Sequence, residues 1–176
     1  MRILIDTNVL YPTVLRGLVT GCAARGLFRP FWSARILEEW TRAVLRDAPG
    51  DETIVRGEIA ALRARFPEAE VAVPEDEPAG LWLPDLADIH VLAAAIAGEC
   101  EAILTMNIRD FPVRLLAKQG IRREEPDLFL LSLPRGAVTE VVGAELEQLR
   151  VLSGEDWTIR RMLRKARLPR LARALG

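Results

Sequence analysis

The sequence contains few of the residues on which several common catalytic and structural schemes depend. It has two cysteines and one histidine. Cys22 and Cys100 lie in apolar helical surroundings without metal-ligand spacing, so we expect buried free thiols rather than a disulfide framework. A single histidine, with no serine or cysteine in a nucleophile turn, argues against a catalytic triad. We therefore interpret His90 as a hydrogen-bonded structural residue.

Two longer sequence features are also absent. No glycine-rich phosphate loop occurs, which argues against a dinucleotide-binding or P-loop protein. No apolar run reaches the roughly 18 residues needed to span a bilayer. The first residues enter an apolar strand pattern directly, without the features of a signal sequence. We therefore expect a soluble, cytoplasmic protein that has no membrane partner.

The composition is that of a globular protein with an uneven distribution of charge. Hydrophobic residues make up 50% of the 176 positions and charged residues 28%, enough to bury a core without disulfides. The formal net charge is only -1, but residues 150–176 contain eight basic and two acidic residues and thus carry +6. An acidic body with a basic end indicates either a polyanionic partner or docking of that end against acidic protein surface.

Short apolar runs alternate with segments of helical periodicity along most of the chain. This alternation predicts an α/β sandwich around a parallel sheet, followed by a helical C-terminal extension. We expect residues 74–82 to form an irregular surface loop. The expected strands are residues 2–6, 27–32, 70–73, 102–105 and 121–124.

Acidic residues stand where several of these elements begin or end. Asp6 ends the first strand, Asp110 follows the fourth, and Asp88 lies in the first turn of an Ala-rich helix. Parallel connections bring the carboxyl ends of strands to one edge, so these residues should lie close together, with Glu38 or Glu39 leaning over the same edge. Carboxylates crowded in this way repel unless a divalent cation lies between them. The chemistry that uses such a cluster is attack of water on phosphate assisted by Mg²⁺ or Mn²⁺.

Each acid also has an ordinary structural explanation. Asp85 and Asp88 could cap a helix and complement its dipole, and for Asp85 we favour this role over metal ligation. Asp110 could be a turn residue, and Glu38 and Glu39 could be solvated helix charges. Asp6 is harder to explain in this way, because neighbouring Thr7 or Asn8 could perform any capping task.

Four motifs occur in a fixed order along the chain. They are Ile3-Leu4-Ile5-Asp6-Thr7-Asn8, Ser33 with Ile36-Leu37-Glu38-Glu39, Pro84-Asp85-Leu86-Ala87-Asp88-Ile89-His90 followed by Ala93-Ala94-Ala95, and Thr105-Met106-Asn107-Ile108-Arg109-Asp110-Phe111-Pro112. Together they resemble the motifs of the PIN-domain nucleases, and most closely the group that includes the VapC-like toxins of bacterial toxin-antitoxin pairs. The resemblance covers about residues 1–130. It implies a three-layer sandwich with a central parallel sheet of about four or five strands.

The resemblance implies an endoribonuclease that depends on Mg²⁺ or Mn²⁺. Its partners would be an RNA substrate and a cognate antitoxin protein, and we allow for a homodimer. The family's four catalytic and metal-binding acids fall on Asp6, Glu39, Asp88 and Asp110, with Glu38 competing for the second role. The polar positions that support them fall on Thr7, Asn8, Asp85, Thr105 and Asn107.

The basic end of the chain extends beyond the region that resembles the compact toxins. We expect a nuclease domain over residues 1–133 and a basic helical extension over residues 134–176, packed on the domain or projecting from it. Its arginines either contact RNA or pair with the acidic body; they are Arg160, Arg161, Arg164 and Arg167. The competing functions are a catalytically weak RNA- or protein-binding module and a metal-dependent phosphatase or DNA nuclease.

Overall fold

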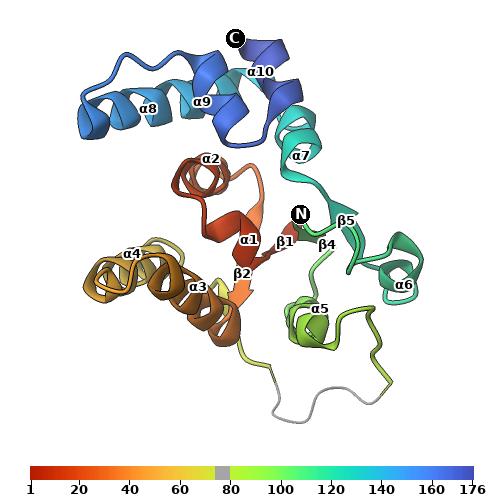
Figure 1. Ribbon diagram of the computed structural model, residues 1–176. Helices are drawn as coiled ribbons and strands as arrows, with labels where there is room; N and C mark the ends of the chain where they lie inside the picture. The colour runs from red at the N-terminus through yellow and green to blue at the C-terminus, as the bar shows by residue number, and fades with distance from the viewer. Residues whose placement is uncertain (74–79) are drawn as a thin grey trace. The chain divides into compact units, whose positions relative to one another are not determined.

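The computed structural model describes residues 1–73 and 80–176 (Figure 1). The loop predicted over residues 74–82 therefore lies mostly outside the described residues. The chain divides into two compact units. Residues 1–11 and 28–124 form what we call the sheet unit, and residues 12–27 and 125–176 form the helical unit. The division into a domain and an extension at residue 133 stays a prediction.

The sheet unit is built on five parallel strands in the order β3-β2-β1-β4-β5. The register places Leu4 beside Phe31 on one side and Ile103 on the other. This architecture confirms the predicted α/β fold with a central parallel sheet. The strands are β1 (Arg2–Ile5), β2 (Arg29–Ser33), β3 (Glu70–Val71), β4 (Ala102–Leu104) and β5 (Arg122–Glu124).

The central strands are apolar because both of their faces are buried. Ile3, Leu4 and Ile5 of β1 have no exposed surface, nor do Ala102, Ile103 and Leu104 of β4. Continuous apolar runs of this kind are typical of parallel strands that are covered on both sides. The helices of the sheet unit are α1 (Thr7–Leu10), α3 (Ala34–Asp47), α4 (Glu52–Arg65), the 3₁₀ turn η1 (Leu86–Asp88), α5 (Ile89–Ala97) and α6 (Val113–Ala117).

Helix α3 carries one acidic side chain of the expected site, Glu39, and another, Asp88, is the N-cap of α5. The Ser33 side chain caps α3 by accepting a hydrogen bond of 3.3 Å from the Ile36 backbone N–H. Because α3 buries Ile36, Leu37 and Trp40, Glu39 is half-buried while Glu38 faces solvent. Helix α5 is apolar and buried along most of its length, and it packs against β1, β2 and β4.

Apolar residues at helical spacing from Val9 to Ala23, with Pro12 suited to a first turn, predict one helix after β1, but the structure contains two helices there. Helix α1 begins at Thr7 and ends at Leu10, and a second helix, α2 (Thr13–Ala24), starts after Pro12. Pro12 is the N-cap of α2 rather than a residue of its first turn. Proline has no backbone N–H and fixes its own backbone, so it cannot continue α1 and instead starts a new helix.

The helical unit contains α2, α7 (Pro126–Ser132), α8 (Arg135–Ser153), α9 (Ile159–Lys165) and α10 (Pro169–Leu175). Helix α2 packs along α8 and approaches it closely at Gly21, where an added Cβ would lie 2.7 Å from Val141 Cγ1. The Asp127 carboxylate accepts hydrogen bonds of 2.9 Å from the backbone N–H groups of Arg170 and Leu171, at the start of α10. In the described ranges, no helix has the length and apolar character required to cross a membrane.

Candidate active site

Asp6 lies buried between the ends of two neighbouring strands. It follows β1, and its backbone N–H donates to the Leu104 carbonyl of β4 at 3.1 Å. Its carboxylate accepts hydrogen bonds from Thr105 Oγ1 at 2.6 Å and from Asn8 Nδ2 at 2.5 Å. Asp6 is only 5% exposed, and this burial raises its pKa although the hydrogen bonds from Thr105 and Asn8 oppose the shift. The chain thus holds an acidic group in a fixed orientation at the sheet edge.

Three further aspartates form a cluster. One carboxylate oxygen each from Asp85, Asp88 and Asp110 lies within 4.8 Å of the others. Oxygen ligands that sit about 2.0–2.6 Å from one cation are at most about 5.2 Å apart, so this spacing is compatible with a shared Mg²⁺, Mn²⁺ or Ca²⁺ ion. Asp85 also accepts a hydrogen bond of 2.9 Å from the Ala87 backbone N–H and caps η1. We call these three residues the aspartate cluster.

The electrostatics of Asp88 connect the aspartate cluster to Asp6. The pKa of Asp88 is raised to about 6, first by partial burial and then by the negative charges of Asp6, Asp85 and Asp110. Asn107 Nδ2 donates a hydrogen bond of 3.0 Å to the Asp88 carboxylate and holds it in place. A set of hard oxygen donors that repel one another fits a divalent cation, because the cation would neutralise them.

Glu39 is half-buried and contacts two polar residues outside the aspartate cluster, Thr7 and His90. Thr7 Oγ1 donates to its carboxylate at 3.2 Å, and His90 Nε2 lies 2.8 Å from Glu39 Oε1. This His90 contact is at ion-pair distance, although neither ring nitrogen has a partner with hydrogen-bond geometry among the described residues. Partial burial raises the pKa of Glu39, but His90, Thr7 and Arg35 outweigh it and the pKa is lowered. Glu39 is therefore kept as an anion.

The structure brings some of the expected site residues together and leaves others apart. Asp88 and Asp110 meet in the aspartate cluster, where their third member is Asp85. Among the described residues, Asp6 and Glu39 are not part of that cluster. Asp6 nevertheless lies close enough to raise the pKa of Asp88, and the charge of Glu39 in turn raises the pKa of Asp6. The acids thus form a connected series rather than one compact group.

The supporting polar residues connect the strand ends. Asn8 Oδ1 accepts a hydrogen bond of 2.9 Å from the Met106 backbone N–H, and its Nδ2 also donates to Thr105 Oγ1 at 3.1 Å. Thr105 Oγ1 in turn accepts from the Asn107 backbone N–H at 2.9 Å. The sequence favoured capping over metal ligation for Asp85, whereas the structure shows both the cap and a place in the cluster. The contact of His90 with Glu39 was not anticipated. Asp85 carried a signal in its spacing from Asp88, whereas nothing in the sequence connected His90 to a helix about 50 residues earlier.

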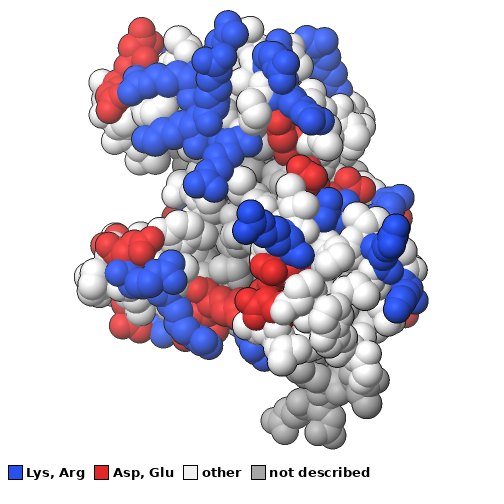
Figure 2. Space-filling model, turned by 45° about the vertical axis from the view of Figure 1, so that its right-hand side comes forward, with Lys and Arg blue, Asp and Glu red and all other residues white. Residues whose placement is uncertain are grey.

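The four arginines expected to contact RNA are exposed on and after α9. Arg161 forms an ion pair of 2.8 Å with Glu155 and lies over the Trp157 ring. Within residues 1–73 and 80–176, the side chains of Arg160, Arg164 and Arg167 form no ion pair. Figure 2 shows Lys and Arg side chains gathered over the helical unit. These cations are thus available to an external anion.

A comparison with models of protein families agrees with the fold. A family model described as the PIN domain matches residues 2–109. Searches of curated proteins and of solved structures gave no match. The matched region contains β1 to β4 together with Asp6, Glu39, Asp85 and Asp88, and it ends one residue before Asp110. Because the match covers more than half of the chain, the protein belongs to the PIN-domain family, whose members are generally metal-dependent nucleases.

Proposed function

We propose that the protein is an endoribonuclease that depends on Mg²⁺ or Mn²⁺ and hydrolyses RNA phosphodiester bonds. The observation that supports this most strongly is the aspartate cluster, whose carboxylate oxygens lie within 4.8 Å of one another beside the buried Asp6. Hard oxygen donors select Mg²⁺ or Mn²⁺ rather than softer metals. The resemblance of the acidic motifs to those of VapC-like toxins supports a role as the toxin of a cytoplasmic toxin-antitoxin pair.

The metal would be held by Asp85, Asp88 and Asp110, with Asp6 contributing from the neighbouring strand end. When bound, it would polarise a phosphoryl oxygen and lower the pKa of the attacking water. The protein keeps the ligands in place: Asn107 holds Asp88, while Thr105 and Asn8 hold Asp6. Ligands fixed in this way need little rearrangement when charge develops in the transition state.

Glu39 has a separate task in this scheme. It is half-buried and is kept ionised by its contacts with His90 and Thr7. A carboxylate in this state can accept a hydrogen bond from a water molecule or a substrate hydroxyl and orient it. We assign Glu39 this orienting role, and Glu38 takes no part because it faces solvent and pairs with Arg42 at 3.9 Å.

The basic extension over residues 134–176 would bind the RNA backbone. Exposed arginines without ion pairs suit this task, because they lose no partner when they contact phosphate. Arg160, Arg164 and Arg167 meet this condition among the described residues, and Arg161 meets it less well because it pairs with Glu155. The antitoxin would be a second protein partner that restrains the enzyme.

An RNA cleavage assay tests the proposal. The purified protein should cleave RNA slowly with Mg²⁺ or Mn²⁺, stop when a chelator is added, and lose activity in Asp88→Asn. The amide keeps the shape of the side chain but cannot balance the charge of the cation. Glu38→Gln is the matched control, because it removes an exposed charge from the same unit. Cleavage that resists chelator, or full activity in Asp88→Asn, would contradict the assignment, and RNA binding without cleavage would favour the binding-module alternative.

A further inference from the structure

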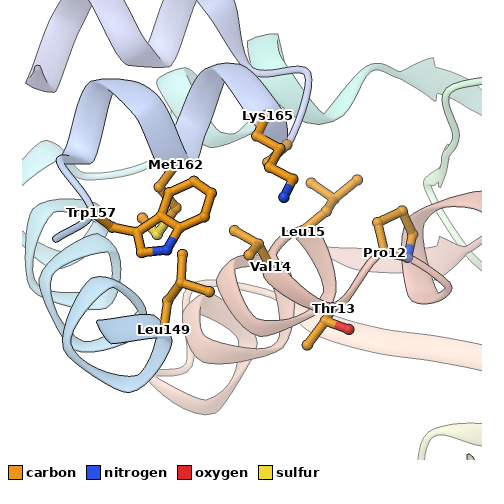
Figure 3. A pocket seen from close by; sticks show the side chains of 9 residues that line it. Pro12, Thr13, Val14, Leu15, Leu149, Trp157, Met162 and Lys165 are labelled. Atoms are coloured by element: carbon orange, nitrogen blue, oxygen red, sulfur yellow. The ribbon is translucent and has the colours of Figure 1, made fainter. Parts of the chain in front are cut away.

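The helical unit contains a cavity that lies outside the candidate active site. It has a volume of about 320 Å³, at the lower end of the roughly 300–1,000 Å³ typical of small-molecule sites. Residues 12–15, from the start of α2, form one wall, and Leu149 of α8 lies opposite, as Figure 3 shows. Trp157, Met162 and Ala166 complete an almost entirely apolar lining.

One charged side chain reaches into this apolar space. The Lys165 ammonium of α9 points into the region between Val14, Leu15 and Trp157 (Figure 3). It lies 5.0 Å from the centre of the Trp157 ring, and in the part of the chain that the structure describes it forms no ion pair. An anion that enters the cavity can therefore form a charge-assisted hydrogen bond with this ammonium group without displacing a protein carboxylate.

The Trp157 ring that faces this cation is fixed in position. Its Nε1 donates a hydrogen bond of 3.1 Å to Ser153 Oγ, and its backbone carbonyl accepts two hydrogen bonds from the Arg150 guanidinium. Trp157 as a whole is only 5% exposed. The cavity therefore has a rigid aromatic wall, and a ligand would not need to order it on binding.

A second cavity in the same unit provides a contrast. It has a volume of about 170 Å³ and is lined by residues of α7, α8 and α10. Its only charged lining residue, Arg135, donates a hydrogen bond of 2.6 Å to the Ala174 carbonyl. That cation already has a protein partner, whereas Lys165 lies over the face of the Trp157 ring and forms no ion pair with any residue that the structure describes. The larger cavity is thus the one with both space and an available charge.

We propose that the larger cavity binds a small apolar molecule that carries one carboxylate group. The apolar part lies against Val14, Leu149, Met162 and Trp157, and the carboxylate pairs with Lys165. A single ammonium group matches a single carboxylate, and the apolar walls exclude a ligand that carries charge along its length. Ligand binding in this cavity does not depend on RNA cleavage at the candidate active site. Each of the two proposals can therefore fail without the other.

Isothermal titration calorimetry of the full chain with decanoate, below its micelle concentration, tests this proposal. We expect one saturable site per chain, and we expect Lys165→Gln to weaken binding about tenfold or more, because an ionic hydrogen bond is lost. Arg164→Gln is the matched control, since Arg164 is the exposed neighbour that does not line the cavity. This variant should bind decanoate as the unaltered protein does.

Two comparisons separate the site from non-specific uptake of an apolar chain. Decanol, which has the same chain without the charge, should bind much more weakly than decanoate, and Lys165→Glu should prefer decylammonium. Lys165 is exposed, so these variants should fold, and thermal unfolding checks that they do. Equal binding of decanol and decanoate, no loss in Lys165→Gln, or no saturable binding at all would overturn the proposal.

Discussion

Glu38 and Glu39 are adjacent in the sequence but have different surroundings. Glu39 contacts Thr7 and His90, whereas Glu38 faces solvent beside Arg42. We expect Glu39→Gln to lower the rate of RNA cleavage about 10–100-fold, as is typical when a group that orients the reacting atoms is lost. Glu38→Gln should leave the rate unchanged. The measurement is the single-turnover rate with saturating Mn²⁺, and the reverse result would transfer the role to Glu38.

Asp85 has two tasks that one substitution can separate. Its carboxylate caps η1 and also belongs to the aspartate cluster. Serine is a good N-cap but carries no charge, so Asp85→Ser should keep the melting temperature and weaken Mn²⁺ binding about tenfold or more. Calorimetry with Mn²⁺ and thermal unfolding give the two readouts. Unchanged Mn²⁺ affinity would show that Asp85 only caps the turn.

The sequence predicts which residues meet when those residues directly follow parallel strands. Asp6 and Thr105 could be expected to meet, because both directly follow strands and parallel strands end at the same edge. The distance between Asp6 and the aspartate cluster could not be predicted. This distance depends on where η1 and the turn before Asp110 place their side chains. Neither segment is an α-helix or a strand, so sequence periodicity does not predict these positions.

Helix packing within the helical unit predicts a dependence of stability on pH. Glu145 of α8 lies against Gly17 of α2, and burial raises its pKa to about 6 from the usual 4.5, although Arg16 opposes the shift. The folded state therefore binds more protons between these pH values, and the free energy of unfolding falls as pH rises through this range. The effect is at most about 1 kcal/mol, because the side chain is partly exposed.

The substitution Glu145→Gln isolates this effect. We expect the variant to be more stable than the unaltered protein at pH 7.5 and equally stable at pH 4, where Glu145 is protonated in both states. Urea unfolding at the two pH values measures the difference. A variant that is destabilised at pH 7.5 would show that the carboxylate makes a favourable interaction between the helices.

Strands and helices with a clear local sequence pattern were predicted well. The break between α1 and α2 was not predicted. The apolar runs of β1 and β4 are local features of the sequence, and both strands start at the residues expected. The Ser33 cap that starts α3 is equally local, because serine is a common N-cap residue. The division at Pro12 was missed because the apolar spacing continues across it, although the chain does not continue as one helix.

At the scale of the whole molecule, the sequence did not predict which helices belong to the same compact unit. Helix α2 belongs to the same compact unit as α7 to α10, which follow it by about 100 residues. Its interface with α8 depends on Gly21 approaching Val141, and a single small residue gives no indication of its distant partner. The family match, in contrast, ends at residue 109 and thus leaves the basic end of the chain unassigned.

The distribution of charge over the molecule predicts how RNA binding depends on salt. We expect the combined change of Arg160, Arg164 and Arg167 to Gln, in a cleavage-deficient Asp6→Asn background, to weaken RNA binding. The slope of log affinity against log salt should fall by about 0.7 for each lost phosphate contact. Arg56→Gln is the control, because Arg56 already pairs with Glu52 at 2.9 Å. An unchanged slope would exclude the extension as an RNA-binding surface.

The central claim is that carboxylates at the ends of the strands form the metal site of a nuclease. Anomalous diffraction from crystals grown with Mn²⁺, measured near the manganese absorption edge, tests it most directly. The account predicts a peak bounded by the carboxylates of Asp85, Asp88 and Asp110, on the side that faces Asp6, and no such peak in Asp88→Asn. Manganese bound only elsewhere, or a peak that persists unchanged in Asp88→Asn, would contradict the assignment.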